Sequence, residues 1–85
     1  MIYEYNIRKK AIKFIKKQNK DQQERILKAI YALPVIGDIK KMSGEERLYR
    51  LRVGDYRILF EMYPKTNTIT LIDITDADNR GQIYK

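Results

Sequence analysis

Arginine and tyrosine side chains recur within two adjacent apolar segments of the chain. Arg50 and Arg52 are two residues apart in residues 48–53, and Arg57 follows in the next segment. Guanidinium groups hold phosphate oxygens through paired N–H donors, and tyrosine rings stack on nucleobases. Because three neighbouring guanidinium groups repel one another unless an anion is present, these segments predict a surface that binds phosphate, and with it nucleic acid. The alternative is a solvated sheet face whose arginines pair with nearby carboxylates: Glu61, Asp73 or Asp55.

Composition restricts the chemistry that is open to this chain. Its 85 residues include 18 Lys and Arg against 11 Asp and Glu, a formal net charge of +7, and contain neither His nor Cys. The chain therefore has no thiol nucleophile, no zinc–thiolate site and no imidazole to act as acid or base at neutral pH. Any catalysis must rest on Arg, Lys, Tyr, Asp or Glu, and we expect neither a metal nor a cofactor.

Length and hydropathy predict one domain that spans residues 1–85. A chain of this size has room for one compact core, and its 44% hydrophobic residues are typical of a folded protein rather than a disordered basic tail. The longest uncharged stretch, residues 29–37, is too short for a membrane span of roughly 20 residues. Residues 1–5 lack the basic and then apolar layout of a secretory signal. We expect a cytoplasmic protein that has no contact with membranes.

The period of the apolar residues predicts which elements position the arginines. Alternation of apolar and polar residues is typical of strands, and apolar residues three or four positions apart are typical of amphipathic helices. The first helix has a lysine-rich outer face; the second begins at a capping box of Asp21 and Glu24, and Pro34 ends it. The predicted elements are a strand at residues 2–7, helices at residues 8–18 and 21–33, and strands at residues 48–53, 56–63 and 68–75.

The predicted order of elements is therefore β-α-α-β-β-β. Because helices and strands are segregated along the chain, we expect an α+β fold in which a helical hairpin packs on one face of an antiparallel sheet. In residues 48–53, alternation directs Arg50 and Arg52 to one side and Tyr49, Leu51 and Val53 to the other. The arginines should then lie on the open face of the sheet, and the lysine-rich helix should lie on the far side.

Three sequence motifs resemble one known family. Residues 48–61 (LYRLRVGDYRILFE) closely resemble the central hairpin of the RelE/ParE superfamily, the toxins of bacterial and archaeal toxin-antitoxin modules. Residues 40–44 (KKMSG) are similar to that family's Lys-Lys-Leu-x-Gly motif, and residues 79–84 (NRGQIY) are similar to its C-terminal His-Arg-x-x-Ile-Tyr. The resemblance covers essentially the whole chain and implies a RelE-like fold.

The resemblance implies a function as well. In the RelE branch it implies the toxin of a type II module, an endonuclease that cuts mRNA in the ribosomal A site. A ribose 2′-OH attacks the adjacent phosphate and leaves a cyclic phosphate, which requires a proton acceptor, cations around the phosphorane and an acid for the departing 5′-oxygen. The implied partners are the ribosome, mRNA and a cognate antitoxin that covers the basic face with an acidic or amphipathic segment.

Site residues follow from the resemblance position by position. Arg57 matches the main phosphate-stabilising arginine, and Arg80 matches the C-terminal arginine. Tyr84 matches a tyrosine that stacks on the base or transfers a proton, and Arg50 falls where relatives place Lys or Arg. Further basic residues are expected to hold the RNA: Lys40, Lys41, Arg47, Arg52 and Lys85. The proton acceptor stays open among four residues: Glu45, Glu46, Lys41 and Asp78.

Two positions depart from the family pattern and leave alternatives open. Asn79 stands where relatives often carry His, and an amide does not transfer protons at neutral pH. Asp78 stands where some relatives carry a basic residue, and it weakens the stabilisation of the phosphate unless it pairs with Arg80. The alternatives are a ParE-like toxin that inhibits DNA gyrase by binding, and an antitoxin-binding module with weak or lost activity. The combination of Arg57, Arg80 and Tyr84 argues against the gyrase inhibitor; Tyr84 is otherwise a packing aromatic.

Overall fold

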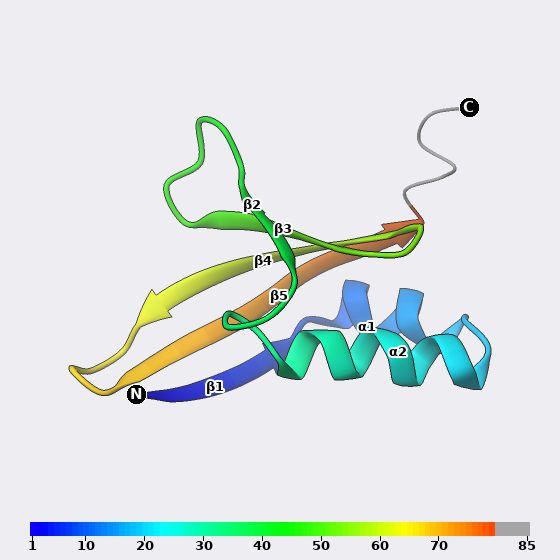
Figure 1. The fold of residues 1–85 in the computed structure, drawn as a ribbon, viewed down its shortest axis with the longest axis horizontal. Coiled ribbons are helices and arrows are strands. Elements are labelled where there is room, and N and C mark those ends of the chain that lie inside the picture. The colour runs from blue at the N-terminus through cyan, green and yellow to red at the C-terminus, as the bar shows by residue number, and fades with distance from the viewer. Residues whose placement is uncertain (80–85) are drawn as a thin grey trace.

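The computed structural model describes residues 1–79, and within them the chain forms two helices and five strands (Figure 1). The helices lie together on one side of the sheet, so the expected α+β class with a helical hairpin on one face is confirmed. One strand, β2, was not expected. The elements are β1 (Ile2–Ile7), α1 (Lys9–Lys16), α2 (Lys20–Tyr31), β2 (Asp38–Lys41), β3 (Leu48–Val53), β4 (Tyr56–Pro64) and β5 (Ile69–Asn79).

The strands form one mixed sheet in the order β1-β5-β4-β3-β2. Strands β3, β4 and β5 pair antiparallel as expected, and the unexpected β2 pairs antiparallel with β3. Strand β1 instead runs parallel to β5, with Ile2 opposite Ile69 and Ile7 opposite Ile74. Apolar alternation looks the same in both directions along a strand. The expectation of an antiparallel sheet therefore holds for β3, β4 and β5 and is corrected for β1.

Strand β2 is the element that apolar alternation did not indicate. It has only four residues, of which Ile39 alone is apolar, and it forms the edge of the sheet by pairing with β3. A short, charged edge strand is protected against pairing with another chain, but its sequence shows too little apolar alternation to predict a strand. Lys40 and Lys41, which belong to none of the predicted helices or strands, lie on this strand.

Both helices are shorter than predicted. Helix α1 ends at Lys16 and α2 begins at Lys20, where the side chain of Asn19 accepts a hydrogen bond from the backbone N–H of Gln22 at 2.9 Å. Asn19 is therefore the N-cap, and Asp21 lies in the first turn of the helix. Neither helix within residues 1–79 is long and apolar enough to cross a membrane.

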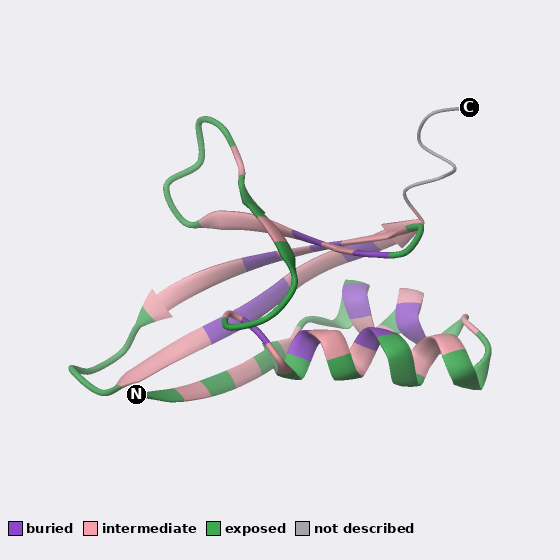
Figure 2. Cartoon of the chain, viewed as in Figure 1, coloured by how far each residue is buried: buried purple, intermediate pink, exposed green. Residues whose placement is uncertain are grey.

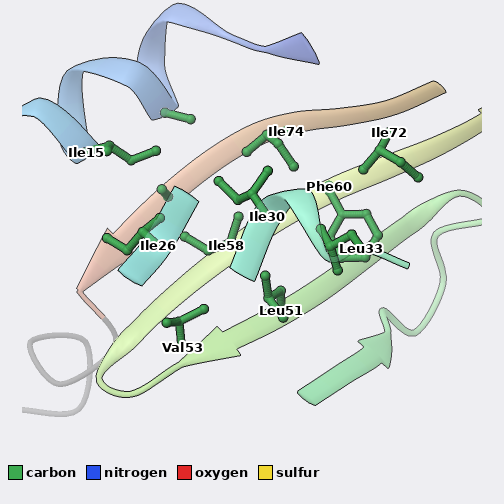
Figure 3. Close-up of a cluster of buried hydrophobic side chains, with 12 residues drawn as sticks. Ile15, Ile26, Ile30, Leu33, Leu51, Val53, Ile58, Phe60, Ile72 and Ile74 are labelled. Atoms are coloured by element: carbon green, nitrogen blue, oxygen red, sulfur yellow. The ribbon is translucent and has the colours of Figure 1, made fainter. Parts of the chain in front are cut away.

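The hydrophobic core lies between the helices and one face of the sheet (Figures 2 and 3). Each fully buried Leu, Ile or Phe side chain contributes about 1.5–3 kcal/mol to folding. Because one face of the sheet is covered in this way, the alternate side chains of β3 and β4 lie on the other face. The core residues are Ala11, Ile15, Ile26, Ile30 and Leu33 from the helical side, and Leu51, Val53, Ile58, Phe60, Ile72, Ile74 and Ala77 from the sheet.

A β-bulge in β5 decides which of its acidic residues reach the open face. Pairing with β4 is regular except between Leu59 and Phe60, where the ladder skips Thr75 of β5. One extra residue shifts the alternation of all later side chains by one position. Asp73 and Asp78, which are five residues apart and would otherwise point to opposite faces, therefore both lie on the open face.

Candidate nucleic-acid interface

Three arginines lie side by side on the open face of β3 and β4. Arg52 is directly opposite Arg57, and Arg50 is opposite Leu59. Directly opposed residues of an antiparallel pair have Cβ atoms about 5 Å apart, so Arg50, Arg52 and Arg57 occupy adjacent positions. This set is hereafter the arginine cluster, and the strand register places it as the alternation predicts.

Two carboxylates flank the arginine cluster. On one side, an oxygen of Asp38 on β2 lies 3.3 Å from a terminal guanidinium nitrogen of Arg50, and its other oxygen lies 3.9 Å from Nε of Arg52. On the other side, Asp78 on β5 accepts a hydrogen bond from Arg57 at 2.8 Å. These two partners differ from the carboxylates that the solvated alternative named: Glu61, Asp73 or Asp55.

The arginine cluster keeps a positive charge despite these partners. Lys40 on β2 is opposite Arg50 and is exposed. Among residues 1–79, the cluster and Lys40 give four cations beside the two carboxylates of Asp38 and Asp78, a net charge of +2. Asp76 on the same face of β5 is paired with Lys10 of α1 at 3.2 Å. The side chains of Arg50 and Arg52 are only 16% and 37% exposed, and their buried Nε atoms make no hydrogen bond with any described residue. Partly desolvated guanidinium groups attract an anion more strongly than fully solvated ones.

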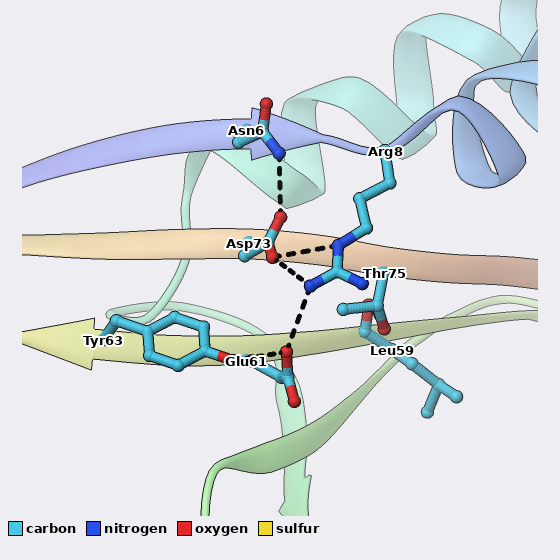
Figure 4. Close-up of polar contacts among 7 residues, drawn as sticks. All are labelled: Asn6, Arg8, Leu59, Glu61, Tyr63, Asp73 and Thr75. Atoms are coloured by element: carbon cyan, nitrogen blue, oxygen red, sulfur yellow. Dashed lines mark hydrogen bonds and ion pairs between the residues drawn. The ribbon is translucent and has the colours of Figure 1, made fainter.

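A separate polar network covers the open face where β1, β5 and β4 meet (Figure 4). Arg8 donates to Asp73 from two nitrogens, at 2.7 and 3.0 Å, and to Glu61 at 3.4 Å. Asn6 also donates to Asp73, at 2.9 Å, and the hydroxyl of Tyr63 donates to Glu61 at 2.7 Å. Arg8 therefore holds the two carboxylates that had been considered as partners of the cluster.

The contacts of this network shift the titration of its members. Burial opposes ionisation of Asp73, but hydrogen bonds from Arg8 and Asn6 and the charge of Arg8 outweigh it, so the pKa of Asp73 lies below its ordinary value. The hydrogen bond to Asp73 raises the pKa of Arg8. The hydrogen bond to Glu61, and then burial, raise the pKa of the Tyr63 hydroxyl. At pH 7 the network therefore contains a positively charged Arg8, an ionised Asp73 and a neutral Tyr63.

Other predicted site residues occupy different places. Lys40 adjoins the arginine cluster, whereas Lys41 points to the opposite face by strand alternation. Arg47 lies just before β3, and its guanidinium carbon is 5.2 Å from the centroid of the Tyr63 ring. The expected positions of Arg80, Tyr84 and Lys85 lie outside the described residues.

Sequence reasoning missed the partners of the arginines. Asp38 was not considered because its strand was not predicted. Asp38 and Lys40 are two residues apart, which is the spacing of side chains on the same face of a strand. Asp78 was considered, but as a partner of Arg80 rather than of Arg57. No signal local to Asp78 reveals its neighbour, because the bulge at Thr75 decides which way it points.

The geometry of this face favours binding and stabilising a phosphate. Guanidinium groups at adjacent strand positions can contact several oxygens of one phosphate and stabilise added negative charge on it. Within residues 1–79, no group of three or more acidic side chains is arranged to hold a metal ion. The described face therefore supplies fixed positive charge, and Asp78 lies within it as the carboxylate bonded to Arg57.

Comparison with known proteins agrees with the fold and the motifs. A family model described as the ParE toxin of the type II toxin-antitoxin system parDE matches residues 6–80. The archaeal RelE-RelB complex from Pyrococcus horikoshii OT3 contains a similar chain with 26% identity and a TM-score of 0.68, covering 96% of this chain and 99% of that one. The RelB-RelE antitoxin-toxin complex from Methanococcus jannaschii contains another, with 28% identity and a TM-score of 0.68, covering 92% and 93%.

A third similar structure supports the fold alone. The toxin-antitoxin complex RelBE2 from Mycobacterium tuberculosis contains a chain with a TM-score of 0.70 and 17% identity, covering 94% of this chain and 100% of that one. No curated protein sequence matches this chain.

Proposed function

The chain belongs to the ParE toxin family, within the RelE/ParE superfamily of type II toxin-antitoxin toxins, and from this premise we propose that it is a ribosome-dependent mRNA endonuclease. The observation that carries the proposal is the arginine cluster, three guanidinium groups at adjacent positions on an open sheet face. A surface that must hold an RNA phosphate during cleavage needs such a group of fixed cations. The proposed target is mRNA on the ribosome, in the cytoplasm.

The proposed reaction is transesterification at one phosphate. The 2′-oxygen forms a bond to phosphorus, the bond from phosphorus to the 5′-oxygen breaks, and a cyclic phosphate remains. Arg57 and Arg50 stabilise the charge of the phosphorane, Arg52 and Lys40 hold neighbouring phosphates, and Asp78 orients Arg57. The 2′-OH gives its proton to an acceptor, and an acid protonates the 5′-oxygen. From the family resemblance, Arg80 and Tyr84 complete the site.

The proposed regulator is a cognate antitoxin. The similar chains from Pyrococcus horikoshii and Methanococcus jannaschii were solved as complexes with RelB. A basic face with a net charge of +2 around the arginine cluster suits an acidic or amphipathic segment that excludes RNA. We therefore expect the antitoxin to cover this face and to suppress cleavage.

Primer extension on mRNA in a translating extract tests the endonuclease. Arg57→Ala is expected to lower cleavage by about 100-fold or more, because removing one donor that stabilises a transition-state oxyanion has an effect of this size. The matched control is Lys28→Ala, which removes an exposed cation from α2, on the covered side of the sheet. Cleavage should require ribosomes and persist in the control; unimpaired cleavage by Arg57→Ala contradicts the assignment of the site.

Inhibition of DNA gyrase is the second candidate function. It is favoured by the family model, which describes a ParE toxin, and by the partial neutralisation of the arginine cluster by Asp38 and Asp78. A supercoiling assay with purified gyrase, run beside the cleavage assay, separates the two. Intact mRNA with inhibited supercoiling would support the gyrase inhibitor, and the absence of both effects would support an antitoxin-binding module without activity.

A further inference from the structure

Arg47 and Tyr63 form a stack at one end of the open face, outside the arginine cluster. The guanidinium carbon of Arg47 lies 5.2 Å from the centroid of the Tyr63 ring. A planar cation at this distance over an aromatic face is attracted by the ring's electron density. The pair presents the charged guanidinium of Arg47 beside an aromatic ring on the open face.

Contacts from two neighbouring residues fix this stack. The hydroxyl of Tyr63 donates to Glu61 at 2.7 Å, within the network held by Arg8 (Figure 4). The backbone carbonyl of Arg47 accepts a hydrogen bond from the N–H of Met62 at 3.4 Å, which keeps the start of β3 beside β4. The Tyr63 ring and the backbone of Arg47 are therefore positioned before any ligand binds.

One face of the Arg47 guanidinium is available to a ligand. Arg47 is exposed, and no carboxylate or hydrogen-bond acceptor among residues 1–79 contacts its side chain. Arg50, Arg52 and Arg57 differ in this respect, since each lies beside Asp38 or Asp78. A planar guanidinium backed by a tyrosine ring on one side offers a stacking surface on the other.

Local charge favours a nucleobase over a phosphate at this position. Glu61 is bonded to Tyr63, and Glu45 and Glu46 immediately precede Arg47 and line a shallow hollow in the loop between β2 and β3. Carboxylates repel a phosphate but accept hydrogen bonds from the amino groups of bases. The surroundings of Arg47 therefore suit a neutral, planar group that carries N–H donors.

The stack lies within reach of an RNA strand held by the arginine cluster. Tyr63 is four residues along β4 from Leu59, which is opposite Arg50. At about 3.3 Å per residue, the two positions are about 13 Å apart, a distance that a few nucleotides span. A strand whose phosphate lies at the cluster can thus place a nearby base at Arg47.

We propose, on the basis of the RNA-binding function proposed above, that Arg47 and Tyr63 form a nucleobase-binding platform. A base near the scissile phosphate stacks on the guanidinium face that points away from Tyr63. Tyr63 holds the guanidinium plane in place and acts as a positioning residue. The platform fixes the register of the RNA strand relative to the arginine cluster.

Binding of a short RNA that carries one abasic ribose tests the platform. The probe is a fluorescently labelled, single-stranded 2′-O-methyl RNA, which resists cleavage by 2′-OH attack, and the abasic ribose is moved along it one position at a time. For the unmodified protein we expect affinity to fall about 5- to 10-fold when the abasic ribose reaches one particular position, because the stacked base is lost. Fluorescence anisotropy gives the dissociation constants.

Variants of Arg47 and Tyr63 complete the test. Arg47→Lys keeps the positive charge but lacks the planar guanidinium. Its affinity for the intact RNA should therefore be lower by the same factor as the abasic ribose causes in the unmodified protein, and the abasic RNA should bring no further loss. Tyr63→Leu should behave like Arg47→Lys, and Tyr63→Phe, which keeps the ring, should retain the position dependence. Lys28→Arg, which exchanges the same two side chains at an exposed position of α2, is the control and should behave as the unmodified protein does.

The outcomes distinguish this inference from the function on which it rests. RNA binding with equal affinity at every abasic position, or Arg47→Lys with unchanged affinity and position dependence, overturns the platform and leaves the arginine cluster as the RNA site. If the unmodified protein binds no RNA, the platform is overturned, and the proposed function is overturned only if primer extension also shows no cleavage on ribosomes. Circular dichroism of each variant establishes that it is folded.

Discussion

Asp78 stands where some relatives carry a basic residue, and it pairs with the arginine proposed to stabilise the phosphate. Its hydrogen bond from Arg57 measures 2.8 Å, and its second oxygen is buried without a hydrogen bond to any described residue. Such a carboxylate has two opposite effects on a phosphate site. It fixes the direction of the guanidinium, and it reduces the positive charge that the phosphate meets.

Substitution of Asp78 separates these two effects. Asp78→Asn removes the negative charge and keeps an oxygen that accepts a hydrogen bond from Arg57. We expect RNA to bind about two- to fivefold more tightly, in line with a partly exposed ion pair worth up to about 1 kcal/mol. Cleavage of bound RNA should slow, because the guanidinium is held less firmly. Anisotropy and single-turnover cleavage measure the two quantities, and weaker binding with an unchanged rate would contradict both roles.

The lowered pKa of Asp73 predicts how stability depends on pH. Because the pKa is lower in the folded than in the unfolded chain, ionised Asp73 stabilises the fold above the ordinary carboxyl pKa of about 4, and this stabilisation is lost as the pH falls through the folded value. Asp73→Asn should therefore be less stable at pH 7 and lose less stability on acidification. Urea unfolding at several pH values measures this.

The matched control for that experiment is Asp55→Asn, which removes an exposed carboxylate from the turn between β3 and β4. This control measures how the removal of one negative charge alone changes the pH dependence of stability. Identical pH dependence of Asp73→Asn and the unmodified protein would show that the contacts with Arg8 and Asn6 do not stabilise the ionised form.

At the scale of elements, α2 supports the sheet from the face opposite the arginine cluster. Asn19 caps this helix through the backbone N–H of Gln22 at 2.9 Å, and Ile26 and Ile30 bury its apolar stripe. Substitutions in α2 should therefore change the stability of the protein without changing RNA binding or cleavage, because the residues that stabilise this helix do not reach the open face.

Asn19→Ala tests this separation. Loss of the side-chain acceptor at the N-cap is expected to lower the free energy of unfolding by about 1 kcal/mol, and Asn19→Ser, which restores an acceptor, should recover most of it. Cleavage and RNA affinity should remain unchanged at a temperature where the variant is folded. Urea unfolding and primer extension measure the two properties; reduced cleavage by a fully folded Asn19→Ala would show that α2 influences the open face.

At the scale of the whole molecule, the net charge of +7 divides between two sides. Helix α1, which carries one group of lysines, packs on the covered side of the sheet (Figure 1). The strand register places the arginine cluster on the open side. Lys10 of α1 pairs with Asp76 of β5 at 3.2 Å. A short RNA should contact the open side alone, since it is too small to reach both. A ribosome is large enough to meet both basic surfaces.

Salt dependence of RNA binding tests this division. Each phosphate contact that is removed should reduce the slope of log affinity against log salt concentration by about 0.7 for a single strand. Arg52→Gln should show such a reduction, whereas Lys13→Gln, an equal change of charge on α1, should not. Anisotropy of a short RNA over a range of salt concentrations gives the slopes, and equal reductions for both variants would mean that the RNA has no preferred face.

The sequence by itself determined the fold class and the sharing of faces along β3 and β4. Alternation depends only on local backbone geometry, so it placed Leu51 and Val53 on the core face and Arg50 and Arg52 on the other, with Arg57 beside them across the hairpin. The motif in residues 48–61 also indicated the family that the comparison identifies. These features are encoded within single segments or between adjacent strands of one hairpin.

Only the tertiary structure decided which carboxylates meet the arginines. Asp38 comes from a four-residue edge strand with one apolar residue, and Asp78 reaches Arg57 because a bulge at Thr75 reverses the alternation of β5. The parallel direction of β1 was decided in the same way. Strand partners, bulges and strand directions depend on contacts between segments that are far apart in the chain, so local periodicity does not predict them.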